Sequence, residues 1–423
     1  MENQIKAIRG MNDILPSETY IWQIVEQKLR HVLQRFAYQE IRLPILEKTE
    51  LFKRTIGEAT DIVEKEMYTF LDRNQESLTL RPEGTAGCVR AGIEHGLFYN
   101  QTQRLWYLGP NFRYERPQKG RYRQFHQCGV EIFGMESPDI DAELILLSAT
   151  IFAELGIIGR LELQINSLGT TQTREQYRDA LVQYFTLHHS ELDEDSQRRL
   201  HTNPMRILDS KNPAMQALIT NAPKMIDYLD AESEQHFKQL QDYLSHMDIA
   251  FTVNPCLVRG LDYYTKTVFE WITTDLGSQN AVCAGGRFDG LVTHLGGSAT
   301  PALGFAIGME RIILLIQQTQ QPLEITPHVY FITDNETASK MAFKLSKELR
   351  EKLPELRLIV HCGGGSLKSQ FKKADKSGAQ IALILGEQEL SKNEIAIKFL
   401  RENAPQEAIA LDKLVSYLQK LTS

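Results

Sequence analysis

Two strand-like segments, residues 104–115 and 123–134, are separated by only a short turn that contains Pro-Gln-Lys-Gly. Parallel strands need a crossover connection of about a dozen residues or more, usually a helix, so this pair is expected to be antiparallel. Residues 77–85 also read as a strand, and several such segments are joined without crossover helices. The spacing therefore predicts an α+β chain built on a largely antiparallel sheet, rather than a doubly wound parallel one.

The N-terminal part adds a helix and one more strand to this expectation. Residues 17–37 place apolar side chains at helical spacing after a Pro-Ser start signal. Residues 39–48, QEIRLPILEK, read as a single strand that Pro44 restricts to a sheet edge or an interface.

A chain of 423 residues is too long for one ordinary hydrophobic core. Residues 170–248 are polar, charged and helical in pattern, and we interpret them as an insertion into a first domain over 1–325. A linker-like segment, TQQPLEITP, follows at 319–327. Beyond it, short apolar strands alternate with helical patterns at 338–352 and 366–377. That alternation predicts a second, α/β domain over residues 328–423.

Composition excludes several classes of protein. No apolar run reaches the roughly 18 residues that a bilayer span needs, and the first residues lack the apolar segment of a signal peptide. The five cysteines are scattered, without a C-x-x-C pair or metal-ligand spacing. We therefore expect a cytoplasmic protein with reduced thiols, no membrane partner and no metal site made of protein ligands alone. A net charge of −7 argues against indiscriminate nucleic-acid binding but permits a local basic site.

Such a basic site is predicted at residues 111–134, where basic residues outnumber acidic ones. On a strand, side chains at i and i+2 share a face, so arginines, carboxylates, an amide and an aromatic ring are expected together on one surface. A solvated ion-pair face is the plain alternative. The residues concerned are Arg81, Glu83, Thr85, Arg113, Glu115, Phe125, Gln127 and Glu131.

Two other segments favour a binding site over a solvated face. LVRGLDYYT (257–265) offers Arg259 and the paired tyrosines Tyr263 and Tyr264, while GFAIGMERI (304–312) places Arg311 at the start of a helix. Guanidinium groups are permanently charged and bind phosphate oxygens bidentately. We expect four arginines from separate segments to converge on one polyphosphate, namely Arg113, Arg121, Arg259 and Arg311. The sequence has no G-x-x-x-x-G-K-[ST] phosphate-binding loop.

Three segments resemble the motifs of class II aminoacyl-tRNA synthetases: EIRLPILE (motif 1), FRYERPQKGRYRQF (motif 2) and GFAIGMER (motif 3). Four more, LVRGLDYYT, AGGRFDGL, TLRPEGT and HQCGVEIFG, are similar to segments of the histidyl-tRNA synthetase family in particular. The resemblance covers nearly the whole chain. It implies a class II catalytic domain, a helical insertion near the tRNA acceptor arm, and a C-terminal α/β anticodon-binding domain.

The same resemblance implies the reaction and its partners. The family activates L-histidine with ATP, releases pyrophosphate, and transfers histidine to the 3′ end of tRNA(His). Mg²⁺ would accompany ATP by bridging its phosphates, an arrangement in which the ion keeps phosphate and water ligands. The motif 1 proline implies a homodimer, since it lies at the dimer interface in the family.

For ATP, the resemblance implies a set of five residues. Arg113 would face the α-phosphate, and Glu115 would meet the adenine. The adenine would stack between Phe125 and Arg311, while Arg121 and Arg311 would hold the outer phosphates.

For histidine, the resemblance implies three groups of contacts. Arg259 would face both the α-phosphate and the substrate carboxylate, and with Arg113 it is the expected catalytic residue. The α-amino group would be received by Glu83, Thr85 and Gln127. The two imidazole nitrogens would bond Glu131 and Tyr264, with Tyr263 close by.

The chain departs from the family pattern at two positions. Phe288 stands where a tyrosine is expected, so one hydroxyl near the substrate pocket is missing. Tyr114 stands where a histidine is common, but strand parity turns its side chain away from the site. Neither change removes a residue assigned to the chemistry.

Two alternatives to a histidine-specific ligase are weighed against this reading. One is the synthetase-like regulatory subunit of ATP phosphoribosyltransferase, which lacks the C-terminal domain and does not need the activation arginines. The other is a class II ligase for a different amino acid, which leaves LVRGLDYYT unexplained. On the C-terminal domain, a lysine face could either contact tRNA phosphate or be plain surface: Lys368, Lys372, Lys373 and Lys376.

Overall fold

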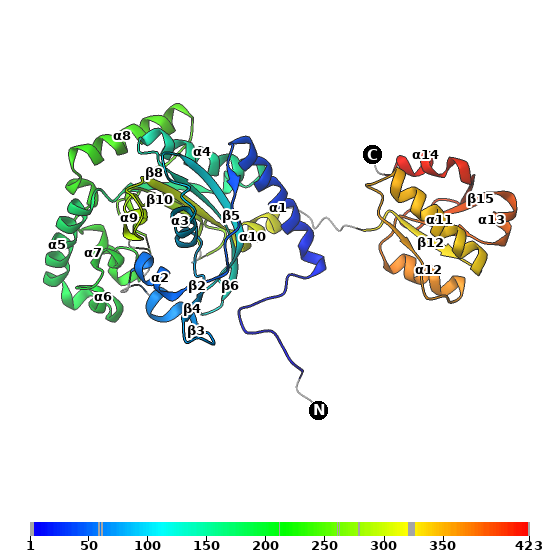
Figure 1. The fold of residues 1–423 in the computed structure, drawn as a ribbon, viewed down its shortest axis with the longest axis horizontal. Coiled ribbons are helices and arrows are strands. Elements are labelled where there is room, and N and C mark those ends of the chain that lie inside the picture. The colour runs from blue at the N-terminus through cyan, green and yellow to red at the C-terminus, as the bar shows by residue number, and fades with distance from the viewer. Residues whose placement is uncertain are drawn as a thin grey trace. The chain divides into compact units, whose positions relative to one another are not determined.

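The computed structural model describes residues 4–57, 60, 62–210, 212–259, 261, 263–277, 280–319 and 326–421. The chain divides into two compact units, Met1–Pro322 and Leu323–Ser423, drawn from blue to yellow and from yellow to red in Figure 1. Each unit has its own sheet and its own hydrophobic clusters. The chain is thus α+β, as predicted.

The first unit is built on an eight-stranded sheet in the order β1-β5-β6-β11-β10-β9-β7-β8. Only the outer pairs β1–β5 and β7–β8 are parallel, and every pair between them is antiparallel. This confirms the predicted antiparallel character. Along the sheet the strands are β1 (Gln39–Glu40), β5 (Gln103–Phe112), β6 (Gln124–Phe133), β11 (Ala302–Gly308), β10 (Ala281–Arg287), β9 (Thr265–Ile272), β7 (Glu162–Ser167) and β8 (Thr252–Val253).

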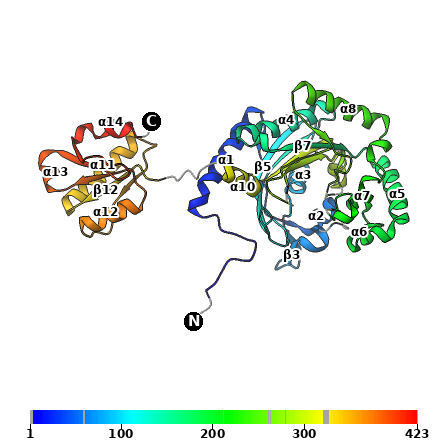
Figure 2. The same cartoon turned by 180° about the vertical axis from the view of Figure 1, so that it is seen from behind.

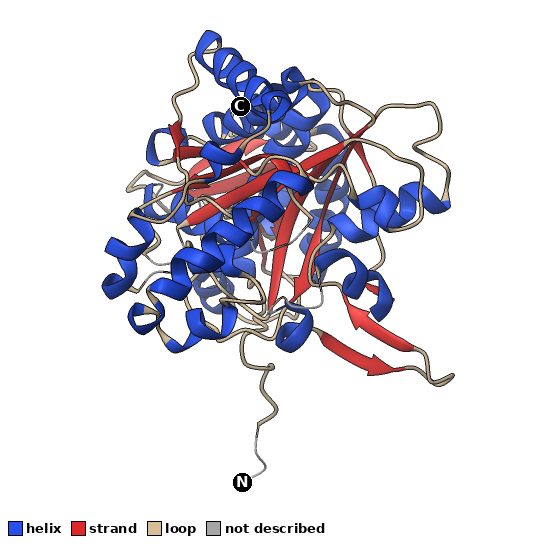
Figure 3. Ribbon diagram, turned by 90° about the vertical axis from the view of Figure 1, so that its left-hand side faces the viewer, coloured by secondary structure: helices blue, strands red, loops and turns tan. Residues whose placement is uncertain are grey.

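The two faces of β5 and β6 have different surroundings. Trp106, Cys128 and Val130 belong to the cluster that helices α1 (Pro16–Arg35), α4 (Pro138–Glu154) and α10 (Met309–Thr319) complete. Because side chains alternate along a strand, their neighbours Tyr107 and Glu131 face the other side of the sheet. Figures 2 and 3 show the strands with helices packed beside them. One face is therefore covered by apolar helices, and the other is left for a site.

The predicted single strand over 39–48 is wrong. The segment forms β1, which joins the large sheet, and β2 (Leu46–Lys48), which joins a separate antiparallel sheet in the order β2-β4-β3. Pro44 lies in the connection and cannot donate to a strand ladder, which explains why pairing is interrupted there. The other strands of the small sheet are β3 (Tyr68–Leu71) and β4 (Ser77–Leu80). Helices α2 (Thr49–Ile56) and α3 (Thr85–Glu94) follow β2 and β4.

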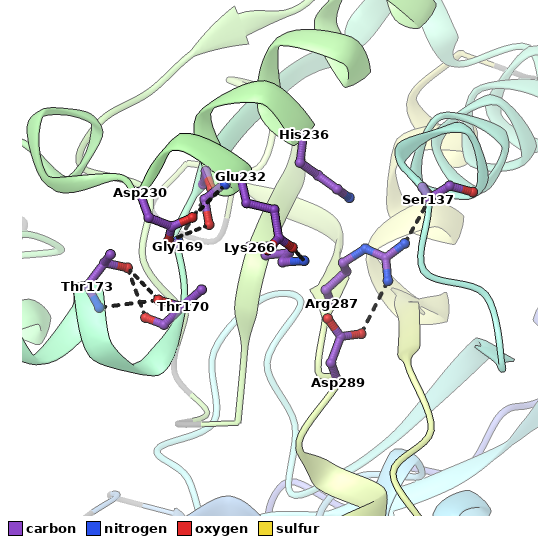
Figure 4. Close-up of polar contacts among 12 residues, drawn as sticks. Ser137, Gly169, Thr170, Thr173, Asp230, Glu232, His236, Lys266, Arg287 and Asp289 are labelled. Atoms are coloured by element: carbon purple, nitrogen blue, oxygen red, sulfur yellow. Dashed lines mark hydrogen bonds and ion pairs between the residues drawn. The ribbon is translucent and has the colours of Figure 1, made fainter.

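The region 170–248 is helical. Side-chain oxygens cap three of its helices at their N-termini: Thr170, Asp193 and Asp230 each accept from a backbone N–H three residues later. Figure 4 shows the Thr170 and Asp230 caps side by side. The helices are α5 (Thr171–Leu187), α6 (Glu194–Arg199), α7 (Gln216–Thr220) and α8 (Ala231–His246).

A buried ion pair fixes the end of β10 to the start of α4. The Arg287 side chain is fully buried, and its Nε and Nη2 donate to Asp141, with Nε to Oδ2 at 2.9 Å and Nη2 to Oδ2 at 2.6 Å. Its remaining N–H groups reach Asp289 and the backbone oxygen of Ser137, as Figure 4 shows, and also the backbone oxygen of Met135. Because the guanidinium is fully hydrogen-bonded, its burial is compensated.

The second unit is a five-stranded sheet in the order β13-β12-β14-β15-β16. The first three strands are parallel and the last two pair antiparallel. The predicted α/β alternation is therefore correct, and two antiparallel strands, β15 and β16, are added at one side of the sheet. The strands are β12 (Val329–Thr333), β13 (Leu358–Val360), β14 (Ile381–Leu385), β15 (Glu394–Phe399) and β16 (Glu407–Ala410); the helices are α11 (Glu336–Lys352), α12 (Leu367–Lys376), α13 (Glu387–Lys392) and α14 (Leu414–Gln419).

Candidate active site

A cavity of about 1010 Å³ lies in the first unit, on the sheet face opposite α1 and α4. Every residue proposed from the sequence for ATP or histidine lines it, although these residues come from five separate stretches of the chain. The lining includes Glu83, Thr85, Arg113, Glu115, Arg121, Phe125, Gln127, Glu131, Arg259, Tyr263, Tyr264 and Arg311.

Glu131 is buried on β6, and its two carboxylate oxygens have different surroundings. Oε1 accepts a hydrogen bond from the hydroxyl of Thr85 at 2.7 Å and another from that of Tyr107 at 2.9 Å. Oε2 is buried and has no hydrogen-bond partner among the described residues. Burial raises the pKa of Glu131 to about 8, while the hydrogen bonds from Thr85 and Tyr107 oppose that rise. One acceptor is thus left for a ligand.

Glu83 precedes helix α3 and binds the helix N-terminus. Its carboxylate accepts from the backbone N–H groups of Thr85 at 2.6 Å and Ala86 at 2.9 Å. Burial raises the pKa of Glu83, and these backbone hydrogen bonds work against it. Nearby, the side-chain oxygen of Gln127 accepts from the Asn111 amide at 2.7 Å. Glu83, Thr85 and Gln127 therefore form one polar wall.

Three aromatic rings form a second wall. Tyr263 and Tyr264 have ring centroids 4.8 Å apart, and Phe288 lies edge-on to both, at 5.6 and 6.4 Å. Phe288 is 1% exposed. At this position a phenyl ring fills a packed aromatic cluster. Gly260, which would permit the chain to bend between Arg259 and Tyr264, lies outside the described residues.

Arg259 lies across the cavity and forms an ion pair with Glu270 on β9. Its guanidinium also lies 5.6 Å from the ring centre of Tyr264. Burial works to lower the pKa of Arg259, but Glu270 and the two neighbouring tyrosines raise it overall. The positive charge is therefore held in place inside the cavity.

The remaining arginines are also held by protein groups. Arg113 donates to the backbone oxygen of Pro82 at 2.9 Å, and its guanidinium lies 5.2 Å from the Phe125 ring centre. Arg121 forms an ion pair with Glu115. Arg311 donates to the backbone oxygens of Gly120 and Ala281. Burial lowers the pKa of Arg113, and it lowers that of Arg311 together with the neighbouring arginines.

Of two expectations based on strand parity, one needs correction. Arg81 was grouped with Glu83 and Thr85 on one strand face, but β4 ends at Leu80 and Thr85 begins α3. The Arg81 side chain instead donates to the backbone oxygens of Pro110 and Leu43, so its role is structural. Tyr114 does turn away: it is 52% exposed and stacks against Arg123.

Two residues of the site were missed. Tyr107 contacts Glu131, and Glu270 pairs with Arg259; both line the cavity. The parity rule gives a signal for Tyr107, because it lies six residues before Arg113 on the same segment and so shares its face. For Glu270 the sequence offers no comparable signal, since its partner is reached only through the fold.

No group of three or more His, Cys, Asp or Glu residues suited to hold a metal occurs in the part of the chain that the structure describes. Within the same residues, no helix is long and apolar enough to cross a bilayer.

Comparison with known proteins identifies both units. Residues 10–312 match the family model described as histidyl-tRNA synthetase, and residues 328–421 match that of an anticodon binding domain. A histidine–tRNA ligase of Hydrogenovibrio crunogenus is 57% identical over 420 residues, which is 99% of this chain and 98% of that protein.

Solved structures agree. The apo histidyl-tRNA synthetase of S. aureus is 38% identical with a TM-score of 0.81, covering 98% of this chain and 99% of its own. A Bacillus halodurans C protein, titled an ATP phosphoribosyltransferase regulatory subunit/histidyl-tRNA synthetase, is 20% identical with a TM-score of 0.65 and covers 91% of this chain and 99% of its own. At that identity it shares the fold alone. On its motifs, its cavity and its full-length similarity, this chain belongs to the histidyl-tRNA synthetase family.

Proposed function

We propose that the protein is a histidine–tRNA ligase. It activates L-histidine with ATP as histidyl-adenylate and then transfers the histidine to the 3′ end of tRNA(His). The observation that carries this most strongly is the buried Oε2 of Glu131, which has no hydrogen-bond partner among the residues that the structure describes and lies in a cavity with Tyr264 and Arg259. An imidazole needs an acceptor for its N–H and a group that can serve its other nitrogen, which Glu131 and Tyr264 supply.

In the first step, a carboxylate oxygen of histidine attacks the α-phosphorus of ATP, and pyrophosphate leaves with the electrons of the broken P–O bond. Arg259 and Arg113 stabilise the charge that develops on the α-phosphate. Glu83, Thr85 and Gln127 hold the α-amino group. In the second step, a ribose hydroxyl at the tRNA 3′ end attacks the activated carbonyl, and AMP leaves.

On the nucleotide side, Glu115 binds adenine, which stacks between Phe125 and Arg311, while Arg121 and Arg311 hold the outer phosphates. The Arg121–Glu115 ion pair supports this assignment. It places at the cavity wall both a cation for the phosphates and a carboxylate that can accept from adenine, and ATP would separate the two. Arg113 and Arg311 donate to backbone oxygens, which phosphate oxygens can outcompete.

Mg²⁺ would accompany ATP and would supply positive charge to its phosphates. The carboxylates that line the cavity are mostly engaged by protein donors, as Glu83 is by backbone N–H groups and Glu115 by Arg121. An ion held chiefly by phosphate and water oxygens would fit that donor set.

A homodimer and a cytoplasmic location complete the proposal. Exposed apolar side chains on and near the small sheet support a dimer interface in the motif 1 region: Ile45, Leu46, Phe70 and Leu71. The use of tRNA as substrate supports work in the cytoplasm.

The regulatory-subunit reading is disfavoured by the second unit and by Arg113, Arg259 and Arg311 in the cavity. The deciding experiment is ATP–pyrophosphate exchange with each amino acid supplied singly. We expect efficient exchange with histidine alone, because a site built to bond both imidazole nitrogens rejects analogues without them by roughly 10⁴–10⁵. Exchange with another amino acid in place of histidine would contradict the assignment.

A further inference from the structure

Tyr107 is a buried residue of the cavity wall. Its hydroxyl donates to the carboxylate of Glu131, the residue proposed to bind the imidazole. Its side chain is 3% exposed, and it lies on β5 directly opposite Gly129 of β6. The hydroxyl donates to Oε1 of Glu131 at 2.9 Å. It is therefore placed to act on Glu131.

The Glu131 carboxylate is held in one orientation from both sides. Thr85 and Tyr107 donate to Oε1, while Oε2 lies against Gly304 of the adjacent strand β11. A Cβ atom added at Gly304 would be 1.9 Å from Oε2, so only glycine leaves room for that oxygen. Within the described part of the chain, two donors bind Oε1 and none binds Oε2, which leaves Oε2 as the acceptor for a ligand.

Two further glycines make room for the Tyr107 ring. A Cβ added at Gly84 would lie 2.1 Å from the ring, and one added at Gly129 would lie 2.2 Å from it. Both distances are far below any real carbon contact. The ring is thus held between two backbone segments, one preceding α3 and one in β6, which fixes where its hydroxyl can reach.

We propose that Tyr107 is a positioning residue for histidine recognition: it holds Oε1 of Glu131 so that Oε2 accepts an imidazole N–H. The inference rests on the proposed function, because the imidazole defines what Oε2 binds. Tyr107 acts through Glu131, and its loss should weaken histidine recognition while leaving ATP recognition intact.

The electrostatics of Glu131 provide a second readout. Burial raises the pKa of Glu131 to about 8, and the hydrogen bonds from Thr85 and Tyr107 lower it. Removing the Tyr107 hydroxyl therefore raises that pKa further. Ionised Glu131 is the acceptor, so histidine affinity increases as pH rises through this pKa, and the increase moves to higher pH in the variant. The other titratable groups that face Glu131 are Glu83, Cys88, Tyr263 and Tyr264.

The test is Tyr107→Phe, assayed by histidine-dependent ATP–pyrophosphate exchange in the full-length protein between pH 6 and pH 9. We expect KM for histidine to rise about tenfold, the size of a lost hydrogen bond to a charged group. KM for ATP should change less than twofold. The increase of histidine affinity with pH should occur at a higher pH than in the unmodified protein. Tyr177→Phe is the matched control, since it removes a buried hydroxyl that donates to Pro223 in the insertion and should change none of these quantities.

An unchanged KM for histidine would overturn the inference. So would equal rises of KM for histidine and KM for ATP, with the pH dependence of histidine affinity unchanged. If circular dichroism shows that Tyr107→Phe does not fold, Gly129→Ala replaces it, because it keeps the hydroxyl but displaces the ring. That variant should also raise KM for histidine selectively, and failure to do so would equally overturn the inference. Absence of histidine-dependent exchange in the unmodified protein would instead refute the proposed function.

Discussion

At the scale of single residues, the cavity is charged before any substrate enters. The Arg259 side chain is 15% exposed and forms an ion pair with Glu270, so its positive charge is balanced by a carboxylate. Such an arrangement avoids the cost of an unpaired buried charge. When a phosphate group enters the cavity, the guanidinium of Arg259 can bind two of its oxygens. Arg259 is therefore preorganised for the α-phosphate.

Arg259→His tests that role. We expect the rate of histidine-dependent exchange to fall about 10²–10³-fold, the usual cost of removing one aligned donor in a transition state. Arg104→His is the matched control, because Arg104 also pairs with a glutamate, Glu143, but does not line the cavity. Histidine binding, measured by calorimetry, should be less affected than the rate. An Arg259→His protein that activates histidine at the normal rate would contradict the assignment.

At the scale of elements, the rule that side chains at i and i+2 of a strand share a face gave correct predictions within strands and wrong ones at strand ends. On β6 it placed Phe125, Gln127 and Glu131 on one face, and all three line the cavity. It failed at 81–85, where β4 gives way to helix α3, and at 39–48, where one segment serves two sheets. Local pattern cannot reveal either event, because tertiary pairing decides them. The ion pair between Arg259 and Glu270 was unpredictable for the same reason.

Another element-scale feature, the Arg287–Asp141 pair, gives a stability prediction. Asp141→Ala leaves a fully buried guanidinium without its main partner, so we expect the free energy of unfolding of the first unit to fall by about 3–5 kcal/mol. Arg54→Ala, which removes an exposed helical pair with Glu50 on α2 of the same unit, should cost no more than about 0.5 kcal/mol. Urea denaturation of both variants measures the difference. Equal small losses would show that the buried pair contributes little.

At the scale of the whole molecule, the two units have separate cores. The apolar cluster of the second unit draws only on residues after Pro327, and every residue proposed for activation precedes Pro322. Exposed lysines on α12 add possible phosphate contacts, which position a nucleic acid without reading its sequence. Activation and tRNA grip are therefore expected to be separable.

Removing residues 328–423 tests this division. We expect the shortened protein to keep histidine-dependent exchange, to charge tRNA poorly, and to bind tRNA with a weaker salt dependence because fewer counterions are released. Circular dichroism on the same sample controls for folding. A folded truncation that charges tRNA with unchanged KM and rate would show that the second unit does not grip the anticodon arm.

The order of strands in the large sheet has a consequence for biosynthesis. β11 lies between β6 and β10, yet it is the last strand of that sheet to leave the ribosome. Until residue 308 has been translated, the nascent chain holds two half-sheets whose inner edges have no partner, and unpaired edges are sites of aggregation. The strand that carries Gly304 and leads into Arg311 thus closes the sheet and completes the cavity in one event. A ribosome stalled before β11 has left the exit tunnel should therefore present a chain that depends on chaperones, whereas one stalled once α10 has left the tunnel should not.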